Sequence, residues 1–337
     1  MNKSEKILSV NDLSVGFAGR KGSRELLLNI NSDVEKGELI AMVGANGVGK
    51  STMLRTIVGL HPRLAGNISL INRELGDYSR QDIARKAAFV TAGSTVSQNL
   101  TVYELVSLGR FPHTNWIGQL KDIDKEHINS SIEDVGLSGK MDIRIDQLSD
   151  GEKQRAMIAR AVAQDTELLV LDEPTAFLDL PNKYELIHLL RRLAETNNKS
   201  IIFSTHDLHI ALKESDKIWL LIKSQLIQGA PEDLILNGSV KEIFTNSQLE
   251  FSEEEGNFYL PAEAKFYLRL RSSDNLKNAT RQALERINVK ITEDKRDPLL
   301  EADFTSSGPG WTLYSDDSDR SFDSIYNLCR FLKSIQD

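Results

Sequence analysis

The chain has 337 residues, of which 40% are hydrophobic and 27% charged, a composition typical of a globular protein with one large domain or two domains. Its formal net charge of −8 lacks the basic excess of most nucleic-acid-binding proteins, so we expect no nucleic-acid partner. Cys329 is the only cysteine, which excludes an internal disulfide and favours a reducing compartment. The N-terminus does not resemble a signal peptide, and no apolar run reaches the roughly 18–20 residues that span a bilayer.

In chain order, the first part of the sequence alternates between strand-like and helix-like patterns. Residues 7–35 are predicted to form short strands with turns, and residues 37–44 a buried strand that leads through a glycine-rich loop into a helix over 52–60. Further strands are expected at 66–71 and 87–90. The order strand, loop, helix is typical of the start of an α/β domain.

From about residue 101 to 164 the spacing of apolar residues is helical. The segments that follow alternate again between buried strands and amphipathic helices. Strands are predicted at 167–175 and 200–207, helices at 182–198 and 208–216, and a strand pair over 217–229. This alternation predicts an α/β fold.

Composition changes near residue 250, where residues 249–261 resemble a hairpin with an acidic turn. Beyond it a βαββα pattern predicts a small α+β domain, with Trp311 and Tyr314 in its core. Its strands are expected at 265–273, 299–306 and 310–316, and its helices at 275–289 and 322–336. We therefore divide the chain into domains of residues 1–250 and 251–337, and the sequence does not indicate the role of the second.

Residues 44–51 read GANGVGKS and match the phosphate-binding loop pattern Gly-x4-Gly-Lys-Ser. Glycines allow successive backbone N–H groups to point at phosphate oxygens, Lys50 neutralises the β- and γ-phosphates, and the Ser51 hydroxyl can bind Mg²⁺. The loop lies between a predicted strand and a predicted helix, as the motif requires. We expect nucleotide contacts from Gly44, Asn46, Gly47, Gly49, Lys50, Ser51 and Thr52.

Two adjacent acidic residues, Asp172 and Glu173, lie at the carboxyl end of a buried strand, where open α/β sheets bind ligands. We expect Asp172 to hold Mg²⁺ through water and Glu173 to polarise the attacking water. His206 follows the next buried strand and is placed to contact the γ-phosphate, whereas Asp207 is expected to cap the following helix. The predicted catalytic residues are therefore Glu173 and His206.

The stretch QLSDGEKQRAMIARAVAQ, residues 147–164, allows two interpretations. Ser149 and Glu152 fit the capping-box pattern at the start of a helix. A helix N-terminus is also an anion site, although Asp150 and Glu152 add negative charge here. Local sequence rules leave both interpretations open.

Four motifs follow one another in a fixed order: the phosphate loop, LSDGE at 148–152, LLVLDEPT at 168–175 with Leu178-Asp179 after it, and STHD at 204–207. Together they resemble the ATP-binding subunit of an ABC transporter over about residues 7–250. The stretches TVYELVSLGRFPH and LLVLDEPTAFLDL resemble the subgroup that serves importers of iron–siderophores, haem and vitamin B12. The resemblance implies a RecA-like core, an antiparallel β subdomain and a helical subdomain at about 93–165, with a C-terminal extension.

The resemblance also implies how the site operates, with ATP and Mg²⁺ as cofactors. Phe17 falls where the family places an aromatic ring on adenine, and two copies would pack head to tail as a homodimer around ATP. Contacts to the ATP of the opposite copy would come from Ser149, Gly151, Glu152 and Asp179. We expect the Ser149 cap to loosen on dimerisation and the Asp150 carboxylate to point away from the phosphate.

The implied partners are transmembrane permease subunits and, indirectly, a substrate-binding protein, so the chain would lie peripherally on the cytoplasmic face of the inner membrane. Residues 93–120, including Arg110 and Phe111, are expected to dock a cytoplasmic helix of the permease. The sequence departs from the family at Ala92, which replaces a glutamine and cannot bind Mg²⁺; Gln98 lies farther along. A second departure, KSQL at 223–226, replaces a glycine turn and is expected to change only that turn.

Other functions stay open at this point. The chain could be a non-transport ABC ATPase that acts on nucleic acid or in metal-cluster assembly, or a cassette regulated by a ligand of the C-terminal domain. A single cassette, the absence of a heptad run and the negative net charge argue against an enzyme that acts on nucleic acid. The transported substrate is not readable, because specificity in such importers lies in the permease and the binding protein.

Overall fold

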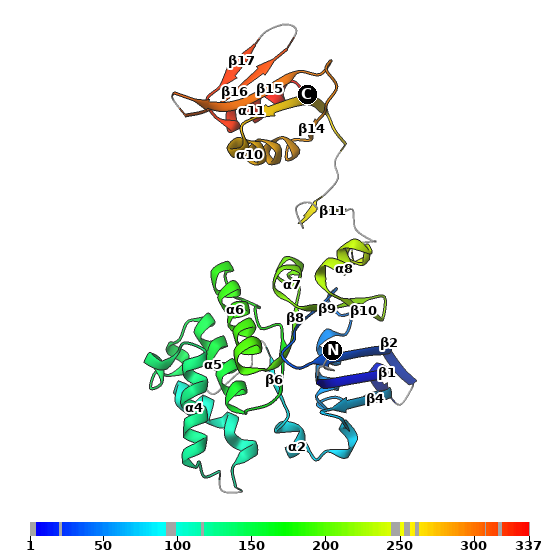
Figure 1. The fold of residues 1–337 in the computed structure, drawn as a ribbon, viewed down its shortest axis with the longest axis vertical. Helices are drawn as coiled ribbons and strands as arrows, with labels where there is room; N and C mark the ends of the chain where they lie inside the picture. The colour runs from blue at the N-terminus through cyan, green and yellow to red at the C-terminus, as the bar shows by residue number, and fades with distance from the viewer. Residues whose placement is uncertain are drawn as a thin grey trace. The chain divides into compact units, whose positions relative to one another are not determined.

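The computed structural model of the chain describes residues 5–19, 22–91, 99–115, 118–243, 250–252, 257–259, 263–306, 308–315 and 319–336. The chain forms two compact units, one of residues 1–247 and 251–258 and the other of residues 248–250 and 259–337 (Figure 1). Each unit is built around apolar residues of its own.

A six-stranded sheet in the order β10-β9-β3-β8-β7-β6 is the centre of the larger unit. Its strands are β3 (Leu39–Gly44), β6 (Ala87–Thr91), β7 (Leu168–Asp172), β8 (Ser200–Thr205), β9 (Lys217–Ile222) and β10 (Gln225–Gly229). All pair in parallel except β10, which is antiparallel to β9. β3, β7 and β8 are buried along their whole length, as expected of parallel strands that are covered on both faces of the sheet.

Helices cover one face of this sheet, namely α5 (Asp150–Ala163), α6 (Leu180–Asn197) and α7 (Leu208–Glu214) (Figure 1). Side chains of the sheet such as Ala41 and Phe203 belong to the same apolar cluster as these helices. On the opposite face, Ile40 and Met42 pack with α1 (Lys50–Ile57) and with an antiparallel sheet. The larger unit is thus layered on both sides of the core sheet, and α1 runs from the edge where β3 ends.

The antiparallel sheet has the order β2-β1-β4-β5 and consists of β1 (Lys6–Gly19), β2 (Gly22–Glu35), β4 (Ala65–Leu70) and β5 (Arg73–Glu74). The prediction of several short strands over 7–35 was wrong, because β1 and β2 form one long hairpin of two 14-residue strands. Register shifts along the pair, including one between Val15 and Gly16, account for the broken alternation in the sequence.

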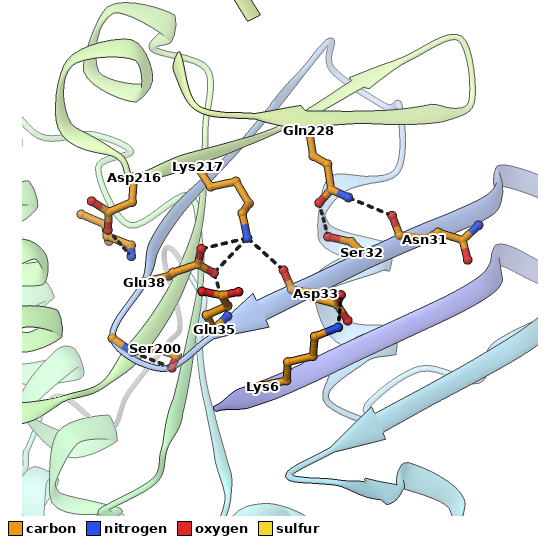
Figure 2. Close-up of polar contacts among 12 residues, drawn as sticks. Lys6, Asn31, Ser32, Asp33, Glu35, Glu38, Ser200, Asp216, Lys217 and Gln228 are labelled. Atoms are coloured by element: carbon orange, nitrogen blue, oxygen red, sulfur yellow. Dashed lines mark hydrogen bonds and ion pairs between the residues drawn. The ribbon is translucent and has the colours of Figure 1, made fainter. Parts of the chain in front are cut away.

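A polar network joins the antiparallel sheet to the core sheet (Figure 2). The Lys217 ammonium donates to the Glu38 carboxylate at 2.8 Å and to the carbonyl of Asp33, at the end of β2, at 3.2 Å. Ser32 Oγ donates to Gln228 Oε1 at 2.5 Å, and Gln228 Nε2 donates to the carbonyl of Asn31 at 3.1 Å. The network fixes β2 against the last hairpin of the core sheet.

That hairpin turns through Lys223 and Ser224, which both have positive φ angles of 46° and 67°. Two left-handed residues in a two-residue loop make the turn type that suits the twist of antiparallel strands. The KSQL departure therefore changes a local turn, as expected, and the carbonyl of Ser224 accepts from the amide of Leu28 in β2.

The remaining elements of the larger unit are short, except for α4 with its 13 residues. The helices are α2 (Arg80–Ala84), α3 (Val102–Ser107), α4 (Asp122–Asp134), α8 (Pro231–Leu236) and α9 (Ser239–Glu242). The 3-10 turns are η1 (Leu75–Asp77), η2 (Leu108–His113), η3 (Ser138–Lys140) and η4 (Ile145–Gln147). The predicted hairpin near residue 250 is present as β11 (Glu250–Ser252) and β12 (Asn257–Tyr259).

One residue of the predicted docking surface lies in the interior. Arg110 is 4% exposed, its Nε donates to the buried Asp124 at 2.9 Å, and its Nη1 donates to the carbonyl of Ala163 at 2.7 Å. The expectation that Arg110 faces a partner was therefore wrong, because this guanidinium holds α4 to the end of α5. Phe111 is 70% exposed and stays a docking candidate.

The smaller unit contains a five-stranded sheet in the order β14-β13-β15-β16-β17 with two helices. Its elements are β13 (Phe266–Ser272), α10 (Asp274–Glu285), β14 (Val289–Ile291), β15 (Leu299–Thr305), β16 (Gly308–Tyr314), β17 (Arg320–Phe322) and α11 (Ile325–Ser334). Trp311 is buried as predicted and donates to Thr280 Oγ1 at 2.9 Å. The core assignment of Tyr314 was wrong, because this side chain is exposed and its hydroxyl donates to Glu301.

Among the described residues, none of the helices combines the length and the apolarity needed to cross a bilayer.

Candidate functional site

The phosphate-loop pattern forms a tight turn between β3 and α1. Gly47 and Gly49 have φ angles of 77° and 116°, values that residues with a Cβ rarely adopt. Gly49 is followed directly by Lys50, the first residue of α1, so the loop leads into a helix N-terminus with its free N–H groups. Ser51 and Thr52 lie in the first turn, and Asn46 is exposed on the loop.

The Lys50 side chain is almost fully buried beneath the loop, where its Nζ donates to the carbonyls of Gly44 at 2.8 Å and Ala45 at 3.2 Å. Burial lowers the pKa of the Lys50 ammonium, and the nearby Glu173 and Asp172 carboxylates act in the opposite direction. The loop thus encloses a cation at the edge of the sheet where a phosphate is expected.

The two acidic residues of the sequence motif lie at the same edge. Asp172 is 8% exposed, and its Oδ1 accepts hydrogen bonds from Ser51 Oγ at 3.0 Å and from Ser204 Oγ at 2.8 Å. Glu173, the next residue, has a φ angle of 52°, in the left-handed region. The chain therefore turns sharply at Glu173, and the two consecutive carboxylates leave the strand in different directions.

His206 lies between the cation and the second carboxylate. Its Nδ1 is 3.4 Å from Lys50 Nζ, and its Nε2 is 2.5 Å from Glu173 Oε1. An ammonium can only donate, so Nδ1 is the acceptor and the imidazole proton lies on Nε2, which donates to Glu173. The structure thus brings Lys50, Glu173 and His206 together, and Asp207 caps α7 as predicted.

Ser204 is a site residue that the sequence analysis did not assign. It is fully buried at the end of β8, donates to Asp172, and accepts from the backbone N–H of Glu173 at 2.8 Å. One hydroxyl therefore positions both acidic residues. The available signal was a polar residue that ends the apolar run of β8, two positions before His206.

Phe17, the predicted adenine contact, lies near the end of β1 with 48% of its side chain exposed. Its ring meets the ring of His61 nearly edge-on, with centroids 5.2 Å apart and an interplanar angle of 72°. A half-exposed aromatic side chain held by a neighbouring ring leaves apolar area available for a flat ligand.

The stretch at 147–164 begins α5 with the capping box that its sequence indicated. Ser149 Oγ accepts from the N–H of Glu152, and Glu152 Oε2 accepts from the N–H of Ser149 at 3.0 Å. Glu152 also accepts from Lys140 Nζ at 2.5 Å, and that hydrogen bond is the main reason why the pKa of Glu152 falls to about 2. The Asp150 carboxylate forms an ion pair with Lys153, with Oδ1 3.4 Å from Nζ.

Asn182 connects the start of α5 with the residue that caps α6. A Cβ added to Gly151 would lie 2.7 Å from Asn182 Oδ1, so only glycine fits there without a shift. Asn182 in turn donates to Asp179, the N-cap of α6, at 2.6 Å. Gly151 and Asp179 therefore lie near each other within one chain.

No hydrogen bond or ion pair within the described part of the chain links the start of α5 or Asp179 to the phosphate loop or its carboxylates. The predicted site residues thus form two groups: one at the edge of the core sheet and one at the N-termini of α5 and α6. Ala92 and Gln98, which bear on the missing glutamine, lie outside the described residues.

Comparison with known proteins agrees with this geometry. Residues 27–176 match the ABC transporter family, and residues 274–333 match the family described as the iron ABC transporter C-terminal domain. The chain is 36% identical over 238 residues to the iron(3+)-hydroxamate import ATP-binding protein FhuC of Bacillus subtilis, which covers 70% of this chain and 87% of that protein. It is 33% identical over 241 residues to the petrobactin import ATP-binding protein FpuD of Bacillus anthracis, covering 71% and 87%.

Among solved structures, cbiO1 of Clostridium perfringens, part of the ABC transporter complex cbiONQ, is 28% identical. It superposes with a TM-score of 0.61 and covers 70% of this chain and 93% of that one. The chain therefore belongs to the ATP-binding cassettes of ABC transporters, and it is an ATPase that binds and hydrolyses ATP.

Proposed function

We propose that this cassette is the ATP-hydrolysing subunit of an importer for iron–siderophore-type substrates, and that two copies close around ATP to drive a separate permease. The observation that carries the proposal is the convergence of Lys50, Ser51, Asp172, Glu173 and His206 at one edge of the core sheet. The substrate class is supported by the import proteins that the chain resembles and by the family of its C-terminal unit.

The Ser51 hydroxyl and the Asp172 carboxylate, 3.0 Å apart, offer the hard oxygen donors that suit Mg²⁺. Bound there, Mg²⁺ would neutralise charge on the β- and γ-phosphates. Lys50 would add the ammonium to the same phosphates, and the N–H groups of the loop and of the first turn of α1 would donate to their oxygens.

In the proposed reaction, Glu173 accepts a hydrogen bond from the water that attacks the γ-phosphate. His206 donates to Glu173 Oε1, which orients the carboxylate, and its other nitrogen lies beside Lys50. The His206 imidazole would then hold the Lys50 ammonium and the Glu173 carboxylate at a fixed distance from each other. This arrangement is the physical reason for assigning both Glu173 and His206 to catalysis.

The group at the N-termini of α5 and α6 would contact the ATP bound by the other copy. Gly151 and the first turn of α5 present backbone N–H groups, and Ser149 would exchange its capping bond for one to the γ-phosphate. Hydrolysis would remove these contacts and reopen the pair, and the permease would follow this cycle. Phe111 and Leu108, both at least half exposed, are candidates for contact with the permease at the membrane.

The variant Glu173→Gln tests the proposal. We expect it to bind ATP, to hydrolyse it about 10²–10⁴-fold more slowly, and to accumulate dimers detectable by light scattering after gel filtration. Glu167→Gln, just before the opposite end of β7, is the matched control and should retain activity. ATP turnover at the wild-type rate in Glu173→Gln would remove this residue from its role.

The substrate class is tested in cells that lack the chain. Uptake of radioactive ferric siderophores should be restored by the wild type and not by Glu173→Gln. Uptake that does not depend on the chain would instead favour an ABC ATPase without a transport role.

A further inference from the structure

We propose that His61 is a positioning residue for the adenine ring of ATP: it holds the carbonyl before Phe17 and supports the Phe17 ring. The inference rests on the proposed contact between Phe17 and adenine. It adds a residue that lies outside every motif in the sequence, in the segment between α1 and β4.

The first observation is the hydrogen bond between His61 and β1. His61 Nε2 lies 2.8 Å from the carbonyl oxygen of Gly16, the residue before Phe17. A carbonyl can only accept, so Nε2 carries the proton and donates it. The imidazole therefore fixes the peptide group that leads into Phe17.

The second observation is the irregular backbone at this point. The pairing of β1 with β2 shifts register between Val15 and Gly16, and such irregularities redirect the next side chain. The strands also approach closely, because a Cβ on Gly16 would lie 2.1 Å from the carbonyl oxygen of Arg24. The direction of Phe17 thus depends on an irregularly paired segment of β1, and His61 donates to the carbonyl of that segment.

The third observation is the ring contact itself. The Phe17 and His61 rings meet at 72° with centroids 5.2 Å apart, an edge-to-face geometry favourable for aromatic pairs. Phe17 remains 48% exposed, so the contact supports the ring and leaves apolar area for adenine.

The fourth observation links this contact to the phosphate site. The amides of Leu60 and His61 both donate to the carbonyl of Arg55 in the last turn of α1, at 2.8 Å and 3.2 Å. The same helix begins with Lys50 and is about 12 Å long. One short element therefore places the phosphate-binding residues at its start and the support of the adenine platform just beyond its end.

The test compares how the full-length chain binds a ligand with adenine and a ligand that has only the phosphates. Calorimetry measures the affinities for AMP-PNP, which contains adenine, and for inorganic tripolyphosphate, which does not. We expect His61→Ala to weaken AMP-PNP binding about three- to tenfold and to change tripolyphosphate binding less than twofold. His61→Gln, which keeps an N–H donor near the position of Nε2 but loses the ring, should lie between wild type and His61→Ala.

His113→Ala is the matched control, since His113 Nε2 lies 2.9 Å from the carbonyl of Gln164 in a bond of the same kind far from Phe17 in sequence. It should change neither affinity. Equal losses for AMP-PNP and tripolyphosphate in His61→Ala, or equal losses in both histidine variants, would show a general structural role and overturn the inference.

Phe17→Ala completes a double-mutant cycle. In that background, His61→Ala should have less than a twofold further effect on AMP-PNP binding. If Phe17→Ala weakens AMP-PNP binding and His61→Ala does not, the inference about His61 is wrong while the adenine contact stands. If Phe17→Ala itself has no effect, the proposed adenine contact fails and the role of His61 fails with it.

Discussion

Replacing Ser204 by alanine removes a single hydroxyl group, but we expect it to impair ATP turnover substantially. The hydroxyl donates to Asp172 and accepts from the N–H of Glu173, both at 2.8 Å, and it is fully buried. Its removal leaves the part-buried N–H of Glu173 without this partner and takes a donor from the buried Asp172 carboxylate. Each loss is typically worth about 1–3 kcal/mol, and because they share one atom we expect the free energy of unfolding to fall by about 2–3 kcal/mol.

The effect on rate follows from the backbone of Glu173. Its φ angle of 52° is in a region that disfavours side chains with a Cβ by about 1–2 kcal/mol. The bond to Ser204, worth about 1–1.5 kcal/mol, helps to hold this conformation. Without it, the ratio of molecules with Glu173 turned toward His206 to molecules with Glu173 turned away should fall about tenfold, because 1.4 kcal/mol corresponds to a factor of ten. We expect kcat to fall by up to this factor, in proportion to the loss of the conformation turned toward His206.

Phosphate release at saturating Mg-ATP measures kcat, and calorimetry with AMP-PNP measures binding, which should change little. Ser200→Ala is the matched control, because Ser200 is equally buried at the other end of β8 and its Oγ accepts one backbone N–H, from Gly37, at 3.2 Å. It should lower stability without lowering kcat. Equal kcat values in the two serine variants, with both folded at the assay temperature, would refute the reasoning.

Two further predictions concern the helical part of the cassette. Arg110→Met leaves the Asp124 carboxylate buried without its guanidinium, so urea denaturation should show a loss of about 3–5 kcal/mol; a loss below 1 kcal/mol would contradict the structure. Lys140→Met removes the main cause of the low pKa of Glu152. A carboxyl group with a depressed pKa stabilises the fold at pH values above its unfolded pKa near 4.3, and this stabilisation is lost as the pH falls toward 2. The variant should therefore be less stable than wild type by under about 1 kcal/mol at pH 7, since Lys140 is half exposed, and the difference should shrink below about pH 4 and be lost as the pH falls through about 2. Thermal melts across this range measure it, and a difference independent of pH would count against the assignment.

The parts of the site that sequence predicts are those governed by local geometry. The phosphate loop needs glycines at fixed spacing between a strand and a helix, and the structure has Gly47 and Gly49 at positive φ before Lys50. Asp172 and Glu173 follow an apolar run, which identifies the carboxyl end of a parallel strand. Ser204 and His61 were not assigned because each acts through a contact with a segment distant in sequence. The polar end of the β8 run marks the position of Ser204 but not its two partners, and His61 lies in no motif.

The errors have similar causes. Arg110 was expected at the surface because the resemblance implies a docking surface over residues 93–120, but Gly109 packs so close to α5 that a Cβ there would lie 2.1 Å from the carbonyl of Arg160. That close packing carries Arg110 into the interior. Tyr314 could have been placed by strand alternation, since the buried Trp311 and Leu313 share one face and residue 314 must face the other. The predicted βαββα pattern was incomplete, because the smaller unit also contains β14 and β17, and strands of three residues are too short to show a period.

The order of the strands in the core sheet determines when each strand can pair during translation. β3, which ends in the phosphate loop, lies between β8 and β9 in the sheet, so it has neither of these partner strands until residues 200–222 have left the ribosome. The junction between Ser32 and Gln228 spans 196 residues and closes later still. A nascent chain that ends before β9 therefore lacks the hydrogen bonds between β2 and the last hairpin, although the β1–β2 hairpin can already pack against α1. The edge of the sheet that holds the ATP site is completed only when β8 and β9 have joined β3.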